Sequence, residues 1–125
     1  MTARIARYPY EAAVTAYGNG GFRFADMSHK GSILCLPSGV YAWDATDAVT
    51  LSVEDFAQML AELPRETVLL LGTGPQQVFM NAAITKAFAE AGIGLEAMTT
   101  GAAARTYNIL LGEKRKVAAA LIAVA

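Results

Sequence analysis

The chain has 125 residues, a length at which a single domain around one hydrophobic core is expected. Its 10 basic and 11 acidic residues give a net charge of −1, which excludes the strongly basic surface that attracts nucleic acids and anionic membranes. Hydrophobic residues make up 54% of the chain, against roughly 45–50% in ordinary soluble domains, and this surplus hints at a surface that a partner buries.

The cysteine content and the apolar runs indicate the compartment. The single cysteine, Cys35, lies in an apolar run, so no intramolecular disulfide can form and a reducing compartment is expected. The N-terminus lacks an apolar region of signal-peptide length, and the longest apolar run, residues 117–125, is too short to span a bilayer. We therefore expect an intracellular protein without a transmembrane segment. It would be cytoplasmic or peripheral to a membrane complex, and mitochondrial if the source is eukaryotic.

The first third of the chain reads as a meander of β-hairpins. Short segments rich in aromatic and branched residues alternate with turn residues, and they predict strands over 12–17, 22–25, 32–36 and 40–43. Glycine-rich residues 18–21 and Pro37-Ser38-Gly39 supply two of the turns. His29 falls between two predicted strands and is expected in a surface loop.

The hydrophobic period then changes to that of helices alternating with strands. Helices are expected over 52–63, 76–91 and 102–112, with Ser52 and Asp55 as a capping box and Pro75 in the first turn of the second helix. Apolar strands are expected over 67–71 and 95–99, parallel and joined by a right-handed crossover. The run 117–124 predicts a further strand, with a C-terminal helix as the alternative.

Two loops should meet at one edge of the sheet, because the carboxyl ends of parallel strands lie together. Ligands of open α/β sheets tend to bind at this edge, where unpaired helix-start amides attract anions. The candidate ligand-binding residues are Gly72, Thr73, Gly74, Thr99, Thr100, Gly101, Arg105, Thr106 and Asn108. Arg105 could clamp an anion, whereas the alternative is that tight turns and a capped helix account for all nine residues. Gln77 occupies the place of the third glycine of the dinucleotide-binding fingerprint, which argues against that cofactor.

Residues for catalysis or metal binding are not indicated. His29 is the only histidine and has no second histidine or cysteine near it to complete a metal site, and neither Ser28 nor Cys35 is a persuasive nucleophile. Tyr107 shares the apolar face of its predicted helix and is expected in the core. We therefore predict no catalytic residues, no metal and no cofactor, and consider an enzyme the less favoured interpretation.

Several segments together resemble a known family. They are Tyr17 with Gly20-Gly21-Phe22, the strand start Gly31-Ser32, Pro37, Trp43, Leu71-Gly72-Thr73-Gly74 and the tail MTTGAAARTYNILLGEKRKVAAALI. The chain is similar over nearly its whole length to the Mth-like domain family, which includes a mitochondrial complex I assembly factor and an adipogenesis-associated protein. The resemblance implies one three-layer α/β domain, residues 1–125, with a central mixed sheet whose last strand is antiparallel. Ala104 stands where related sequences often have a cysteine, which counts against thiol chemistry there.

Two functional hypotheses follow from these observations. The first is a non-enzymatic interaction or assembly factor, with a respiratory-chain complex as a candidate target, that binds a protein partner through outward-facing aromatic residues of the N-terminal strands. The second is a small anionic-ligand-binding protein or enzyme that uses the loops at 72–74 and 99–108. A homodimer is compatible with either hypothesis.

Overall fold

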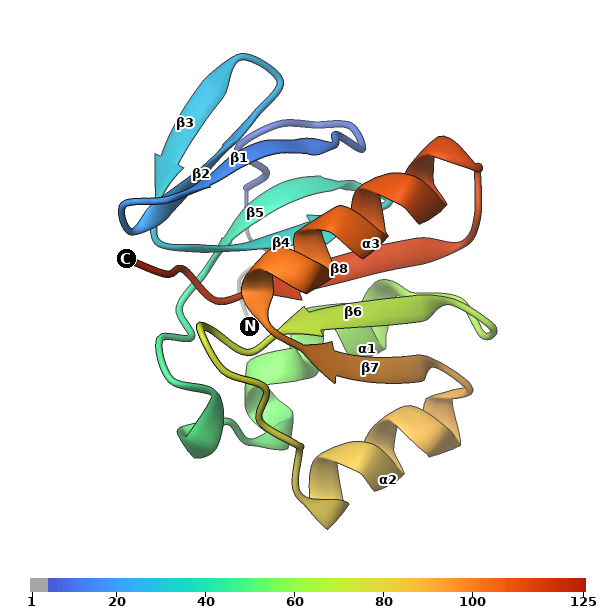
Figure 1. Ribbon diagram of the computed structural model, residues 1–125. Coiled ribbons are helices and arrows are strands. Elements are labelled where there is room, and N and C mark those ends of the chain that lie inside the picture. The colour runs from blue at the N-terminus through green and yellow to red at the C-terminus, as the bar shows by residue number, and fades with distance from the viewer. Residues whose placement is uncertain (1–4) are drawn as a thin grey trace.

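A computed structural model describes residues 5–125 as a mixed α/β fold with two sheets (Figure 1). The larger sheet has five strands in the order β5-β4-β8-β6-β7, and the smaller has three in the order β1-β2-β3. The strands are β1 (Val14–Gly18), β2 (Gly21–Phe24), β3 (Met27–Lys30), β4 (Ser32–Leu36), β5 (Gly39–Trp43), β6 (Val68–Gly72), β7 (Gly94–Met98) and β8 (Val117–Leu121). The helices are η1 (Ala48–Thr50), η2 (Val53–Phe56), α1 (Ala57–Glu62), α2 (Ala82–Ala91) and α3 (Thr100–Gly112).

The central sheet is mixed because β8 lies between two strands of opposite direction. It pairs antiparallel with β4 and parallel with β6, so the expected antiparallel last strand is confirmed on its β4 side. Strands β6 and β7 are parallel neighbours joined through α2, as the crossover argument predicts. The alternative of a C-terminal helix over this segment is wrong.

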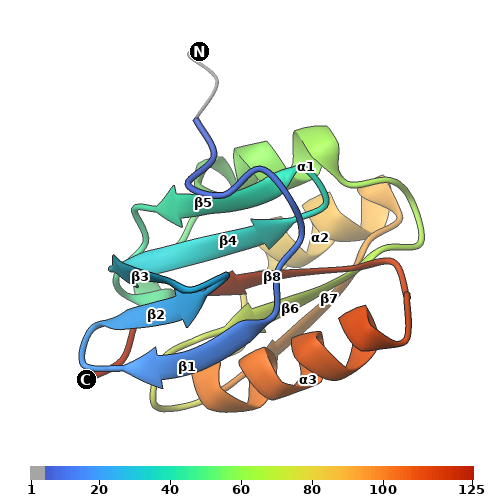
Figure 2. The same cartoon turned by 90° about the horizontal axis from the view of Figure 1, so that it is seen from above.

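The sheet is covered on both faces, which gives three layers. Seen from above, α3 and the small sheet lie on one side of the central sheet, and α1 and α2 lie on the other (Figure 2). Each side has its own buried cluster, one around Phe56, Met59 and Phe88 and the other around Phe24 and Tyr107. No helix within residues 5–125 combines the length and the hydrophobicity needed to cross a membrane.

The N-terminal meander divides between the two sheets, and it contains a strand that the sequence does not predict. Met27–Lys30 forms β3, so His29 lies on a strand and not in a loop. The turn before it places Ala25 and Asp26 at positive φ, 48° and 60°, which is the type I′ hairpin geometry that asparagine and glycine usually supply. Because Ala-Asp is an unusual pair for this turn, the hairpin is not evident from the residues.

Two predicted helices differ from those observed. The segment 52–63 is confirmed as helical, but it begins as the 3₁₀ turn η2, where the Asp55 side chain accepts a 2.8 Å hydrogen bond from the Ser52 amide. The second helix begins at Ala82 and not near residue 76, because Asn81 is its N-cap and accepts a hydrogen bond from the Ile84 amide at 3.0 Å. Pro75 therefore lies in a loop over residues 73–81.

Candidate functional site

The two loops of the predicted site do meet at one edge of the central sheet, at the ends of β6 and β7. Their contacts are direct backbone and side-chain hydrogen bonds. The Thr100 amide donates to the Gly74 carbonyl at 2.9 Å, and the Gly74 amide donates to the Thr100 hydroxyl at 3.0 Å. The Thr73 amide donates to the Met98 carbonyl at 2.9 Å. The loops are thus bonded to each other and not held apart around a ligand.

Thr100 is the centre of this junction. Its side chain is 0% exposed, and its hydroxyl donates to the Ile122 carbonyl at 2.7 Å while it accepts the Gly74 amide. A Cβ at Gly72 would lie 2.9 Å from the Thr100 Cα, so only glycine fits here without moving the backbone. The close packing of these two backbones therefore accounts for glycine at position 72 without a ligand.

Thr73 is also committed to its own loop. Its hydroxyl lies 2.6 Å from the Gln76 carbonyl oxygen and 3.1 Å from that of Met98, and it accepts the Val78 amide at 3.1 Å. A hydroxyl offers one proton and two lone pairs, so these contacts use most of its capacity. The Thr73 hydroxyl therefore has little hydrogen-bonding capacity left for a ligand.

The start of α3 has few amides left for an anion. Thr99 caps the helix by accepting the Ala102 amide at 3.3 Å, and its carbonyl accepts the Ala103 amide at 2.9 Å. A Cβ at Gly101 would overlap the Tyr17 hydroxyl, so the Tyr17 side chain covers this point of the helix. The positive end of the helix is therefore largely satisfied from within the protein.

The three predicted residues further along α3 have different environments. Asn108 accepts the Val14 amide at 2.9 Å and donates to the Val14 carbonyl at 2.7 Å, so its side-chain amide pairs with β1 as another strand would. Arg105 is exposed and its guanidinium lies 3.4 Å from the Tyr17 hydroxyl. Thr106 is half-buried, and its side chain forms no hydrogen bond to any described residue. Of the nine candidate residues, Arg105 is the cation that remains accessible to an anion.

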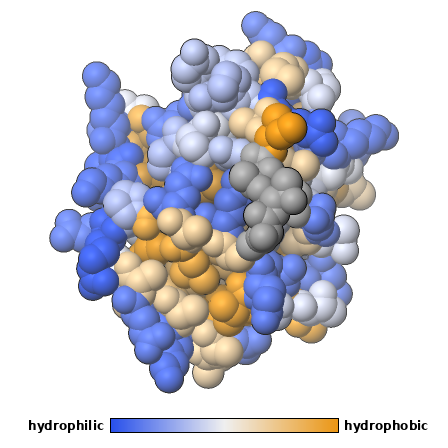
Figure 3. All heavy atoms as spheres, turned by 180° about the vertical axis from the view of Figure 1, so that it is seen from behind, coloured by the Kyte–Doolittle hydropathy of each residue, from blue (hydrophilic) through white to orange (hydrophobic). Residues whose placement is uncertain are grey.

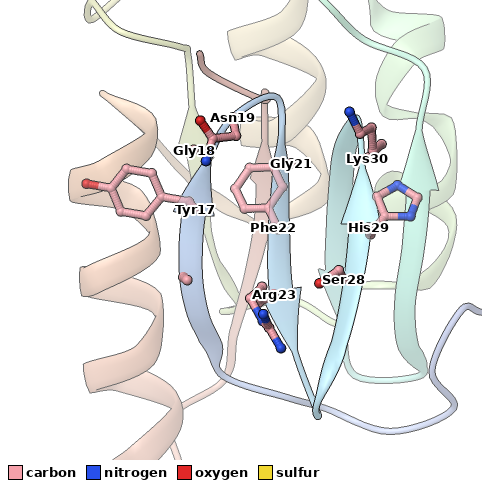
Figure 4. A pocket seen from close by; sticks show the side chains of 10 residues that line it. Tyr17, Gly18, Asn19, Gly21, Phe22, Arg23, Ser28, His29 and Lys30 are labelled. Atoms are coloured by element: carbon pink, nitrogen blue, oxygen red, sulfur yellow. The ribbon is translucent and has the colours of Figure 1, made fainter.

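A shallow depression of about 300 Å³ lies elsewhere, on the small sheet (Figure 4). None of the nine predicted residues lines it. The glycines of the β1–β2 turn leave it open, and Arg23, Ser28, His29 and Lys30 are among the side chains around it. Ser28 and His29 are adjacent on β3 and point to opposite faces, so they cannot act as a nucleophile and its base. Burial and the nearby Arg7 charge lower the pKa of His29.

The buried groups that could react are inert in this fold. Cys35 is 1% exposed, and burial raises the pKa of its thiol to about 12. Tyr107 lies in the core as predicted, and burial raises the pKa of its hydroxyl, which makes no hydrogen bond within residues 5–125. Over the same residues, no three histidine, cysteine, aspartate or glutamate side chains are grouped as a metal site. The described geometry does not assemble a catalytic centre.

Comparison with known proteins establishes the family. Residues 14–122 match the model of a family described as a protein of unknown function (DUF498/DUF598). The chain belongs to this family. Solved structures are similar to the chain as well. The crystal structure of an outer membrane protein from Bartonella henselae is 46% identical, with a TM-score of 0.89, and the match covers 95% of this chain and 100% of that one. A Bordetella pertussis protein described as a Mth938-like domain is 30% identical, with a TM-score of 0.76 and coverage of 98% and 92%. The Mth-like resemblance is confirmed.

Two curated relatives are similar to this chain in sequence. An uncharacterized protein of Rhodobacter capsulatus is 32% identical over 98% of this chain and 93% of its own length. NADH dehydrogenase [ubiquinone] 1 alpha subcomplex assembly factor 3 of Danio rerio is 31% identical over 87% of this chain. The match spans 63% of the length of that assembly factor.

Proposed function

We propose that this chain is a non-catalytic protein-binding domain that assists the assembly of a respiratory-chain complex. The observation that carries this proposal is a contrast in how side chains are used. The backbone groups and threonine hydroxyls at the junction of the two loops are paired within the protein, whereas several large apolar side chains are left in solvent. Phe79 is 80% exposed and Ile109 is 61% exposed. Exposed aromatic and aliphatic side chains are the usual anchors of protein interfaces.

The distribution of apolar surface supports a protein partner. Viewed from behind, apolar side chains gather over α1 and α2 in the lower left of the molecule (Figure 3). The exposed residues of these helices include the alanines Ala61, Ala82, Ala83 and Ala89. On the N-terminal strands and the segment before them, Tyr17 and Tyr10 are 44% and 66% exposed, as the sequence led us to expect for some of the aromatic residues. The relatives named as assembly factors support a subunit of such a complex as the partner.

The test is affinity capture of the full chain from its native cells, followed by mass spectrometry. Phe79→Ser, Ile109→Ser and Tyr10→Ser remove exposed anchors one at a time, and since none is buried each variant should fold normally. We expect at least one variant to lose a partner that the others retain. Recovery of no partner by the unmodified chain, or equal recovery by all variants, would contradict the proposal. Light scattering of the same samples tests whether the chain forms a homodimer.

The contacts of the loops do not favour a second function. An anion-binding site would need open donors near Arg105, but the neighbouring amides of Thr100, Ala102 and Ala103 already donate within the protein. We therefore do not propose the ligand-binding alternative.

A further inference from the structure

Strand β7 forms an outer edge of the central sheet, and its hydrogen-bond register shows which residues face outward. The Gly94 amide donates to the Thr67 carbonyl, and the Met98 carbonyl accepts the Thr73 amide, both at 2.9 Å. In a parallel pair every second residue bonds to the neighbour, so Gly94, Glu96 and Met98 bond toward β6. The backbone groups of Leu95 and Ala97 consequently point away from the sheet.

The two outer strands of this sheet, β5 and β7, differ in how their outward backbone groups are hydrogen-bonded. On the β5 side, the chain before β1 forms a bridge, in which the Val40 amide donates to the Tyr8 carbonyl at 2.9 Å and the Val40 carbonyl accepts the Arg7 and Tyr8 amides. On the β7 side, the described contacts include one from a side chain: Gln77 donates to the Ala97 carbonyl at 2.8 Å. Helix α2 lies on the α1 side of the sheet, and no hydrogen bond among the described residues joins it to β7 (Figure 2). The outward amides of β7 are therefore open.

The side chains along this edge define what could lie beside it. Leu95 and Ala97 pack against the cluster on the α1 side, so Glu96 points to the other side, where it is exposed and has no ion-pair partner within residues 5–125. Val78 and Met80 pack against the same cluster as Leu95, and Phe79 between them is 80% exposed in the loop that also carries Gln77. An apolar anchor and an unpaired carboxylate thus accompany the open backbone.

The charge of Glu96 argues against a second copy of this chain as the occupant. A symmetric antiparallel pair centred on Glu96, which uses the outward groups of both Leu95 and Ala97, would set Leu95 against Ala97 of the second copy. Glu96 would then face its own equivalent, and like charges in directly opposite positions destabilise a sheet. A strand with a basic residue at that position would be favoured instead.

We propose that β7 accepts an extended segment of the partner protein as a sixth strand, with a lysine or arginine opposite Glu96 and apolar residues on either side of it. The Gln77 side chain moves aside when the segment binds. This inference rests on the proposed protein-binding function and names the place and the chemistry of the contact. Addition of a strand to a sheet edge gains main-chain hydrogen bonds for affinity and alternating side chains for specificity.

Nuclear magnetic resonance of the full chain tests the open edge directly. In the free protein, the amides of Leu95 and Ala97 should exchange with solvent at least about tenfold faster than those of Glu96 and Met98, which donate to β6. The probe is a capped synthetic peptide, Ser-Thr-Val-Lys-Val-Thr-Ser, and it should shift and protect the Leu95 and Ala97 amides. Equal exchange of the four amides, or peptide shifts confined to other strands, would overturn the proposal.

Matched variants test the chemistry of the segment. A peptide with Glu in place of Lys should bind about fivefold more weakly, and Glu96→Lys should reverse this preference. Gln77→Ala should strengthen binding of the Lys peptide, because its competing donor is gone. If both peptides bind the unmodified chain equally, or if Glu96→Lys leaves their order unchanged, the assigned role of Glu96 is wrong.

The same variants separate this inference from the proposed function. Ala97→Pro removes an outward amide without removing a bond to β6, and its fold can be checked by circular dichroism. A partner captured by the unmodified chain should be lost with Ala97→Pro and with Glu96→Lys. If that partner is retained by both variants, the β7 inference fails while the protein-binding function stands. If no partner is captured at all, the proposed function itself fails.

Discussion

Replacement of Thr100 by valine should destabilise the protein through two backbone groups at once. Valine has nearly the same shape, so the packing is kept and the hydroxyl alone is lost. The Ile122 carbonyl, which accepts from this hydroxyl at 2.7 Å, and the Gly74 amide, which donates to it at 3.0 Å, would both be left without their partner in a fully buried position. Each unsatisfied buried group costs about 1–3 kcal/mol, so a total loss of about 3 kcal/mol is expected. For a domain of this size, that corresponds to a fall in Tm of roughly 10 °C.

The assay is denaturant and thermal unfolding followed by circular dichroism, with Thr106→Val as the matched control. Thr106 is on the same helix and half-buried, and its side chain forms no hydrogen bond within residues 5–125, so this control should change the free energy of unfolding by about 0.5 kcal/mol or less. A loss below about 1 kcal/mol for Thr100→Val would refute the reasoning, because it would mean that the junction between the two loops does not depend on the hydroxyl. Equal losses in the two variants would refute it as well.

Three further changes have expected outcomes. Tyr107→Phe should leave stability unchanged or raise it by about 1 kcal/mol in urea unfolding, because it removes a buried hydroxyl that makes no hydrogen bond; a clear loss would mean that a partner is present. Asn108→Ala should cost about 2 kcal/mol and speed hydrogen exchange at the Val14 amide, and unchanged exchange would contradict its role as the partner of β1. Burial raises the pKa of Cys35 from 9.0 to about 12, so the unfolded chain loses its thiol proton first as the pH rises. Stability should therefore fall above pH 9, by about 1.4 kcal/mol at pH 10, and Cys35→Ala should lessen this fall.

Hydrophobic periodicity predicts the central part of the fold well. The strands at 67–71 and 95–99, the crossover between them and the helix from about residue 102 are all found with small differences at their ends. These elements are regular, long enough to show a period and buried on defined faces, so the pattern of apolar residues records their positions directly.

The two misplaced elements depend on local chemistry that periodicity does not record. Gln76 and Gln77 are good helix formers after a proline, yet the Thr73 hydroxyl binds this segment as a loop, and Asn81 places the true helix start six residues later than Gln76. Such side-chain bonds to the backbone compete with helix formation. Likewise β3 has few typical strand residues, and it exists because the preceding turn and the β2 backbone specify its pairing.

For the candidate site, the sequence predicts the position of the residues but not what they bind. The sequence correctly places the two loops at the same end of neighbouring strands, since that follows from topology. It does not reveal whether Thr73 and Thr100 present their hydroxyls to a ligand or to nearby backbone groups, because both uses require the same residue types. The hydroxyls bond to backbone groups because the two loops lie within hydrogen-bond distance of each other. That distance is set by how β6 and β7 pack in the assembled sheet, which the sequence pattern does not record.

The position of β8 also sets the order in which the protein can fold. The β4–β5 hairpin and the β6–α2–β7 unit are each local in sequence, but within the central sheet they are joined through β8, whose partner β4 lies more than eighty residues earlier. Neither half can close the sheet until this strand is inserted between them. Folding should therefore be slow for a domain of this size, with contacts to Ala119 and Ala120 made late, because loop closure over such distances precedes any gain from the pairing. Until that step, the inner edges of β4 and β6 are exposed together, which makes the unfilled middle of the sheet the place where misfolding would begin.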